Sequence, residues 1–83
     1  MKTVRLIHWN DDEGLERRKQ LEALGFQAQF DEGAGGQQII RALRASPPDA
    51  VVIDLSRLPS HGREIASTLR TTKSSRHIPI VFV

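Results

Sequence analysis

The chain has 83 residues, of which 39% are hydrophobic and 27% charged, and its formal net charge is +2 at pH 7. This length predicts one domain spanning 1–83, and the composition is that of a globular protein rather than of a disordered or membrane-spanning chain. With no cysteine, a disulfide framework and a thiolate metal site are both excluded. The N-terminal stretch lacks the pattern of a signal peptide, so we expect a cytoplasmic protein.

The first quarter of the chain predicts a strand followed by a surface helix. Residues 3–9, TVRLIHW, are rich in β-branched and apolar side chains, and the polar cluster Asn10-Asp11-Asp12 ends this strand. Asn10 or Asp11 is suited to cap the helix that follows, whose acidic first turn complements the helix dipole. The helix is predicted over 13–24, ends at Gly25 and has an apolar face formed by Leu15, Leu21 and Leu24.

The middle of the chain continues the alternation of strand and helix. Residues 26–30, FQAQF, alternate apolar and polar side chains as in a half-buried outer strand. A helix is predicted over 37–45, and Ser46-Pro47-Pro48 ends it because proline cannot continue the helical hydrogen bonds. Residues 50–55, AVVIDL, have no polar alternation, which is typical of a central strand that is covered on both faces.

The last third predicts one more helix, over 62–70, and a final strand within 77–83. The order of elements is therefore βαβαβαβ, which favours a doubly wound α/β fold with parallel strands joined by right-handed crossovers. Ligands of such sheets bind at the carboxyl ends of the strands, where the strand order reverses. We therefore expect the cluster at Asn10-Asp11-Asp12 and the carboxylate of Asp54 at the same edge of the sheet.

Two acidic groups at one sheet edge suit Mg²⁺, which prefers oxygen ligands. With a metal ion beside it, the carboxylate of Asp54 is able to attack a phosphodonor and form an aspartyl phosphate. The alternative role for Asp54 is that of a loop carboxylate that caps the third helix or the turn before it. The residues alone leave both roles open.

Several segments resemble the receiver domain of bacterial response regulators, over essentially the whole chain. They are the strand PPDAVVIDL, the glycine eight positions after Asp54, the helix end ALGF and the segment GGQQIIRALR. The resemblance implies a flavodoxin-like parallel sheet of strand order 2-1-3-4 that lacks the family's fifth strand and last helices, and hence an incomplete domain. It also implies that Asp54 is the phosphoacceptor and that Gly62 is the glycine of the following loop. The metal ligands that it implies are Asp11, Asp12, Asp54 and the backbone carbonyl of Ser56.

The sequence departs from the family's pattern in three places. Counting back from Gly25 without a gap puts the acidic pair of the family at His8 and Trp9. The family's loop proline falls at Leu58, one position before Pro59. The chain also stops before the family's switch Ser or Thr and its conserved Lys.

These observations predict a signalling domain rather than an enzyme. The first hypothesis is a receiver domain that takes a phosphoryl group on Asp54 from a histidine kinase or a phosphotransfer protein, with Mg²⁺ as cofactor. The alternative is a degenerate pseudo-receiver that acts as a phosphorylation-independent interaction or dimerisation module. Two roles are open for Trp9. It either replaces an acidic residue of the pocket and fills the site, or it covers the end of the sheet core as an aromatic cap. A small flavodoxin-like enzyme ranks last, because the sequence shows no nucleotide-binding loop.

The charges are distributed unevenly along the chain. Seven of the ten acidic residues precede Gly33, whereas residues 57–77 contain five Lys or Arg against the single acidic residue Glu64. Such a stretch attracts phosphate or an acidic partner, or it is only a solvated helix face. Because it has no aromatic platform for bases, we expect no direct nucleic-acid binding, and no membrane contact is expected either. The segment IPIVFV at 78–83 is apolar and uncharged, and as an exposed edge strand it predicts pairing into a homodimer.

Overall fold

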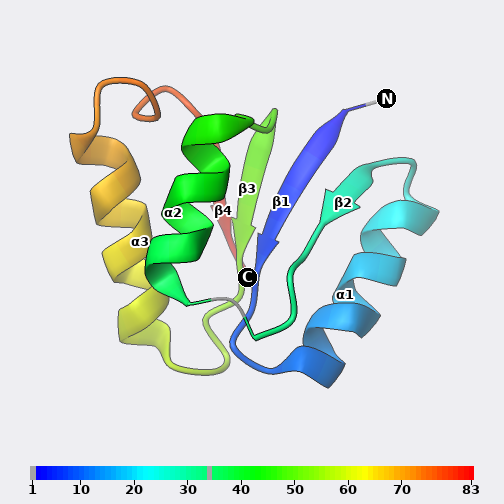
Figure 1. Cartoon of the computed structure of the whole chain (residues 1–83). Helices are drawn as coiled ribbons and strands as arrows, with labels where there is room; N and C mark the ends of the chain where they lie inside the picture. Colours follow the sequence, from blue (N-terminus) through cyan, green and yellow to red (C-terminus); the bar gives the residue numbers. More distant parts are fainter. Residues whose placement is uncertain (1, 34) are drawn as a thin grey trace.

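The computed structural model describes residues 2–33 and 35–83. Their elements, shown in Figure 1, are β1 (Thr3–Ile7), α1 (Asp11–Ala23), β2 (Gln27–Gln29), α2 (Gly36–Ala45), β3 (Ala50–Ile53), α3 (Pro59–Thr71) and β4 (Ile80–Phe82). The strands pair in parallel in the order β2-β1-β3-β4, which confirms the predicted α/β fold and strand order. None of the helices in the described ranges has the length and apolar character that crossing a membrane requires.

The helices lie on both faces of the sheet, α1 on one face and α2 and α3 on the other (Figure 1). On the first face, Leu15 and Leu21 of α1 pack against the buried side chains of Val4, Leu6 and Val52. The larger core lies on the second face, where α2 and α3 cover β1 and β3. Its buried residues are Ile7, Ile39, Leu43, Val51, Ile53, Ile65, Ala66, Leu69 and Ile78.

The capping residue of α1 fixes where the helix begins. The side-chain oxygen of Asn10 accepts a hydrogen bond from the backbone N–H of Glu13 at 3.0 Å, as the sequence predicted for an N-cap. The helix therefore starts at Asp11, two residues before the predicted start. Its first turn is acidic, which complements the positive end of the helix dipole.

The end of α1 is a glycine-dependent turn. Gly25 has a φ of 95°, and the N–H of Phe26 donates to the carbonyl of Leu21 at 3.2 Å, the pattern that closes many helices. Leu24 lies at the C-cap and is 74% exposed. Its predicted place on the apolar face is therefore wrong, because the chain already turns away from the core at this residue.

The start of α3 differs from the prediction for a similar local reason. The helix begins at Pro59 rather than at Gly62, because proline at a first helical position has a suitable φ and no N–H left unpaired. Leu58 precedes it with a φ of 46°, a left-handed conformation that costs a residue with a side chain about 1–2 kcal/mol. A Cβ at Gly62 would lie 2.8 Å from the side chain of Ile53, so the glycine permits close packing of α3 on β3.

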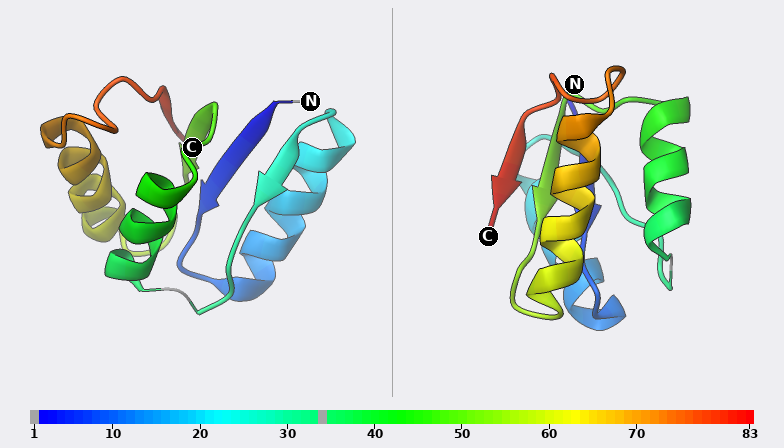
Figure 2. Two further views of the ribbon diagram at one scale, coloured as in Figure 1. Left: turned by 45° about the horizontal axis from the view of Figure 1, so that its top comes forward. Right: turned by 90° about the vertical axis from the view of Figure 1, so that its left-hand side faces the viewer.

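The strand β4 forms the outer side of the sheet. In the right-hand view of Figure 2 it lies beyond β3, and β3 is the strand with which it pairs. Val81, Phe82 and Val83 are about half exposed. Within the described residues, this edge of the sheet is uncovered and apolar.

Candidate functional site

Asp54 directly follows β3, and His8 directly follows the neighbouring strand β1. The backbone N–H of Asp54 donates to the carbonyl of Ile7 at 3.0 Å, which keeps the two strand ends side by side. On the face covered by α1, a cavity of about 270 Å³ opens at this point. We call it the Asp54 cavity; its lining residues are His8, Glu13, Glu16, Arg17, Gln20, Asp54 and Ser56.

A buried histidine occupies the side of Asp54 that faces this cavity. Nε2 of His8 lies 3.2 Å from Oδ2 of Asp54, and the two residues are 7% and 4% exposed. Nδ1 of His8 accepts a hydrogen bond from the backbone N–H of Asn10 at 3.1 Å, so Nε2 is the ring nitrogen that faces Asp54. Nη2 of Arg17 lies 3.6 Å from the same carboxylate oxygen.

The other oxygen of Asp54 caps the connecting turn. Oδ1 accepts hydrogen bonds from the backbone N–H of Ser56 at 2.8 Å and from the Ser56 hydroxyl. Burial raises the pKa of Asp54, but these two bonds and the electrostatic effects of His8 and Arg17 outweigh it and hold the pKa below its usual range. Asp54 therefore caps the turn after β3, which is one of the two capping positions that the sequence left open for it. It does not cap α3, because the N-cap of that helix is Leu58.

Glu13, a second carboxylate close to His8, is held by Arg57 from the loop after β3. Nη2 and Nε of Arg57 lie 2.8 and 3.3 Å from the two carboxylate oxygens of Glu13, and Nε2 of His8 lies 3.6 Å from one of them. The hydrogen bond from Arg57 lowers the pKa of Glu13, and the same contact raises the pKa of Arg57. The carboxylate is thus paired with a guanidinium.

Sequence reasoning missed several of these residues. His8 was signalled by the gap-free count back from Gly25. Glu13 and Arg17 are four residues apart on a predicted helix, the spacing that puts two side chains on one face. For Arg57, the sequence carries no signal that it would reach Glu13.

The structure does not bring the predicted acidic pair to Asp54. Asp11 and Asp12 are exposed in the first turn of α1 and do not line the Asp54 cavity. Instead, Oδ1 of Asp11 accepts a hydrogen bond from the backbone N–H of Gly33 at 3.0 Å. Ser56 does lie beside Asp54, but through its N–H and hydroxyl groups, which are donors in this contact.

The residues around Asp54 do not fit a magnesium ion. Within 2–33 and 35–83, no three His, Asp or Glu side chains form a group suited to hold a metal. Oδ2 of Asp54 faces the imidazole of His8 and the guanidinium of Arg17, and a cation at this oxygen would have to displace the first and would be repelled by the second. Mg²⁺ requires a set of oxygen ligands in near-octahedral geometry, which this arrangement does not offer.

Trp9 lies outside the Asp54 cavity. Its ring packs against the larger core and meets the ring of His61 edge to face, with centroids 5.6 Å apart. The indole N–H is buried and has no acceptor among the described residues. The position matches the aromatic cap on the sheet core rather than a plug of the site.

Comparisons with known proteins place the fold. A scan against protein-family models and a search of curated proteins find no match. Among solved structures, the chain is similar to the N-terminal domain of a response regulator receiver protein from Methanoculleus marisnigri JR1, with 24% identity and a TM-score of 0.84. The match covers 99% of this chain and 65% of that chain, so this chain spans about two thirds of the matched structure. The likeness, together with the β2-β1-β3-β4 parallel sheet, shows that the chain has the fold of a response regulator receiver domain.

Proposed function

We propose that this chain is a phosphorylation-independent interaction domain with the receiver fold, in which Asp54 is a fixed structural carboxylate. One observation carries this proposal: Nε2 of buried His8 lies 3.2 Å from Oδ2 of Asp54. This corresponds to the degenerate pseudo-receiver alternative that the sequence left open.

The chemistry of phosphoryl transfer explains why this contact matters. An attacking carboxylate oxygen must reach the phosphorus atom in line with the leaving oxygen, and cations must neutralise the phosphoryl charge. Here Oδ1 is held by two donors of Ser56, and Oδ2 is covered by His8 with Arg17 nearby. Both oxygens are engaged, and the predicted metal ligands Asp11 and Asp12 do not line the cavity.

The second candidate function is phosphoacceptance on Asp54 from a histidine kinase or a phosphotransfer protein. It is favoured by the position of Asp54 in an open cavity at the carboxyl end of β3. In this case Arg17 would supply the positive charge that a metal ion otherwise supplies, and Nε2 of His8 would donate a hydrogen bond.

Acetyl phosphate separates the two functions. The chain and its Asp54→Asn variant are incubated with acetyl phosphate, with and without MgCl₂, and their intact masses are measured after circular dichroism has verified folding. We expect no phosphoryl adduct in any of the four samples. An adduct on the unmodified chain that is absent from Asp54→Asn would establish phosphoacceptance, and its dependence on MgCl₂ would show whether a metal takes part.

A further inference from the structure

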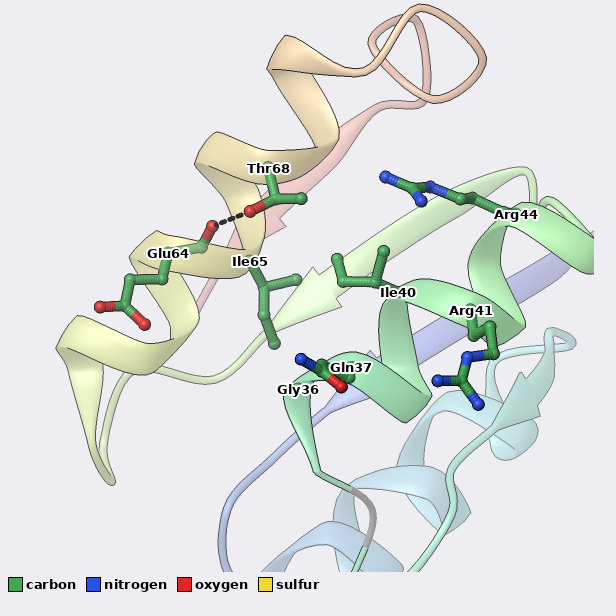
Figure 3. A pocket seen from close by; sticks show the side chains of 8 residues that line it. All are labelled: Gly36, Gln37, Ile40, Arg41, Arg44, Glu64, Ile65 and Thr68. Atoms are coloured by element: carbon green, nitrogen blue, oxygen red, sulfur yellow. Dashed lines mark hydrogen bonds between the residues drawn. The ribbon is translucent and has the colours of Figure 1, made fainter.

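The helices α2 and α3 leave a groove between them that the Asp54 cavity does not include. One part, of about 450 Å³, lies between the two helices. A second part, of about 500 Å³, extends toward Trp9, which follows β1, and Leu58, which precedes α3. The two parts share Gly36, Glu64 and Ile65, so we treat them as one surface, the α2–α3 groove. Figure 3 shows Ile40 of α2 and Ile65 of α3 pointing toward each other across its first part.

The walls of the groove are largely apolar. Ile40 is partly buried and Ile65 is buried, while the second part adds Trp9 and the half-exposed Leu58. Leu58 also holds the left-handed φ of 46°, and strained backbone of this kind concentrates at functional sites. Concave apolar surfaces with a polar rim accommodate the apolar face of a partner segment.

The rim of the groove carries two arginines and one carboxylate, Glu64, so its net charge is positive. Arg41 and Arg44 of α2 are exposed and line it, and neither forms an ion pair among the described residues. In Figure 3, Arg44 extends from α2 toward the side of α3, where its guanidinium donates to the hydroxyl of Thr72 at 3.2 Å. Together α2 and α3 carry four arginines and one carboxylate, namely Arg41, Arg44, Arg63, Arg70 and Glu64.

The opposite face of the sheet has the reverse charge. The helix α1 carries five acidic and three basic residues: Asp11, Asp12, Glu13, Glu16, Glu22, Arg17, Arg18 and Lys19. An acidic partner is therefore attracted to the side of α2 and α3 and repelled from the side of α1, because complementary charge steers the encounter of two proteins.

We propose that the α2–α3 groove docks an acidic amphipathic helix of a partner protein. The apolar side chains of that helix pack over Ile40 and Ile65, and its carboxylates pair with Arg41 and Arg44. The inference rests on the proposed function, since it names the partner chemistry of the interaction domain.

The test uses a defined probe, the peptide Ac-EELLEELLEELLEE-NH₂, with Ac-KKLLKKLLKKLLKK-NH₂ as the basic control. Binding is followed by the fluorescence of Trp9, the only tryptophan of the chain, which lines the second part of the groove. We expect a saturable change with the acidic peptide and none with the basic one. The double variant Arg41→Glu/Arg44→Glu should weaken binding about tenfold or more, the size of effect expected when two charge pairs are reversed.

Two matched variants identify the groove as the binding surface. The α1 variant Arg18→Glu/Lys19→Glu changes the net charge equally and should leave the affinity unchanged, whereas Ile40→Ser should weaken it by removing apolar contact. Circular dichroism verifies that each variant folds. The proposal is overturned by the absence of a saturable response in the unmodified chain both before and after treatment with acetyl phosphate, by equal binding of the basic peptide, or by equal weakening in the α1 variant.

One further experiment distinguishes a failure of this proposal from a failure of the proposed function. The titration is repeated after treatment with acetyl phosphate and MgCl₂. Acidic-peptide binding that appears only when Asp54 carries a phosphoryl group would overturn the phosphorylation-independent function while retaining the groove. Absence of binding with no adduct on Asp54 would overturn the groove and leave the proposed function standing.

Discussion

The environment of Asp54 shows how neighbours decide the chemistry of a single carboxylate. Ser56 engages one of its oxygens, and His8 and Arg17 face the other. The place of Asp54 at the sheet edge was predictable, because a parallel strand must deliver its last residue there. Its contact with His8 was signalled only by the gap-free count back from Gly25, and that count alone did not establish which face His8 lies on, because a shift of one residue at the end of β1 turns a side chain to the opposite face of the sheet.

Ser56→Ala tests the hydrogen bonds that lower the pKa of Asp54. A lowered pKa in the folded state stabilises the fold above the unfolded-state value of about 3.9, and this contribution is lost as the pH falls through the folded-state pKa. Removing the hydroxyl should raise the pKa of Asp54 and reduce the free energy of unfolding by about 1 kcal/mol at pH 7. The reduction should be smaller at pH 3, where protonation of Asp54 is more advanced.

Urea unfolding at pH 7 and pH 3 measures both quantities. Ser67→Ala, at an exposed position of α3, serves as the matched control and should change little at either pH. An equal loss of stability at the two pH values for Ser56→Ala would contradict the account, because the hydroxyl would then contribute independently of the charge on Asp54.

The order and type of the elements followed from the sequence, whereas their ends depended on local contacts. Short runs of apolar and β-branched residues identified the strands, and apolar residues at helical spacing identified the helices. Asn10 and Gly25 marked the two ends of α1. The early start of α3 at Pro59 was missed because the helical apolar pattern begins only at Ile65. The tight contact between Gly14 and Phe30 could not be predicted either, because nothing local in the sequence relates the two residues.

Gly14→Ala tests that contact between α1 and the chain after β2. Gly14 is buried, and a Cβ at this position would overlap the ring of Phe30. We expect a loss of about 1–3 kcal/mol in the free energy of unfolding, the usual cost of overpacking. The matched control is Gly36→Ala at the start of α2, where a Cβ meets nothing within 4 Å and no loss is expected. Equal urea midpoints for the two variants would refute the close packing.

At the scale of the whole molecule, two surfaces are available for contact with other proteins: the α2–α3 groove and the edge strand β4. The charges of the helices divide the two faces of the sheet into an acidic and a basic side. The uneven charge along the sequence indicated the basic residues of 57–77 but not the part that Arg41 and Arg44 of α2 play in this division. The groove itself was not predictable, because it depends on how far α2 and α3 lie apart. The second surface is the half-exposed edge strand β4, which the sequence did predict.

Val81→Lys tests whether β4 pairs with a second copy of this 83-residue chain. We expect the unmodified chain to sediment as a dimer at high concentration and the variant as a monomer, because a charged side chain on an edge strand disfavours pairing with another strand. Leu24→Lys, at the exposed C-cap of α1, is the control and should leave the dimer intact. A monomer at all concentrations of the unmodified chain would dismiss pairing through β4.

The central claim, that His8 excludes a metal ion from Asp54, is tested most directly by calorimetric titration of MgCl₂ into the unmodified chain and into His8→Asp. The variant removes the imidazole and places a carboxylate beside Asp54 and Glu13, which gives Mg²⁺ a set of oxygen ligands. We predict no saturable heat for the unmodified chain, and for His8→Asp saturable binding that also raises its melting temperature. Saturable Mg²⁺ binding by the unmodified chain that disappears in Asp54→Asn would contradict the claim.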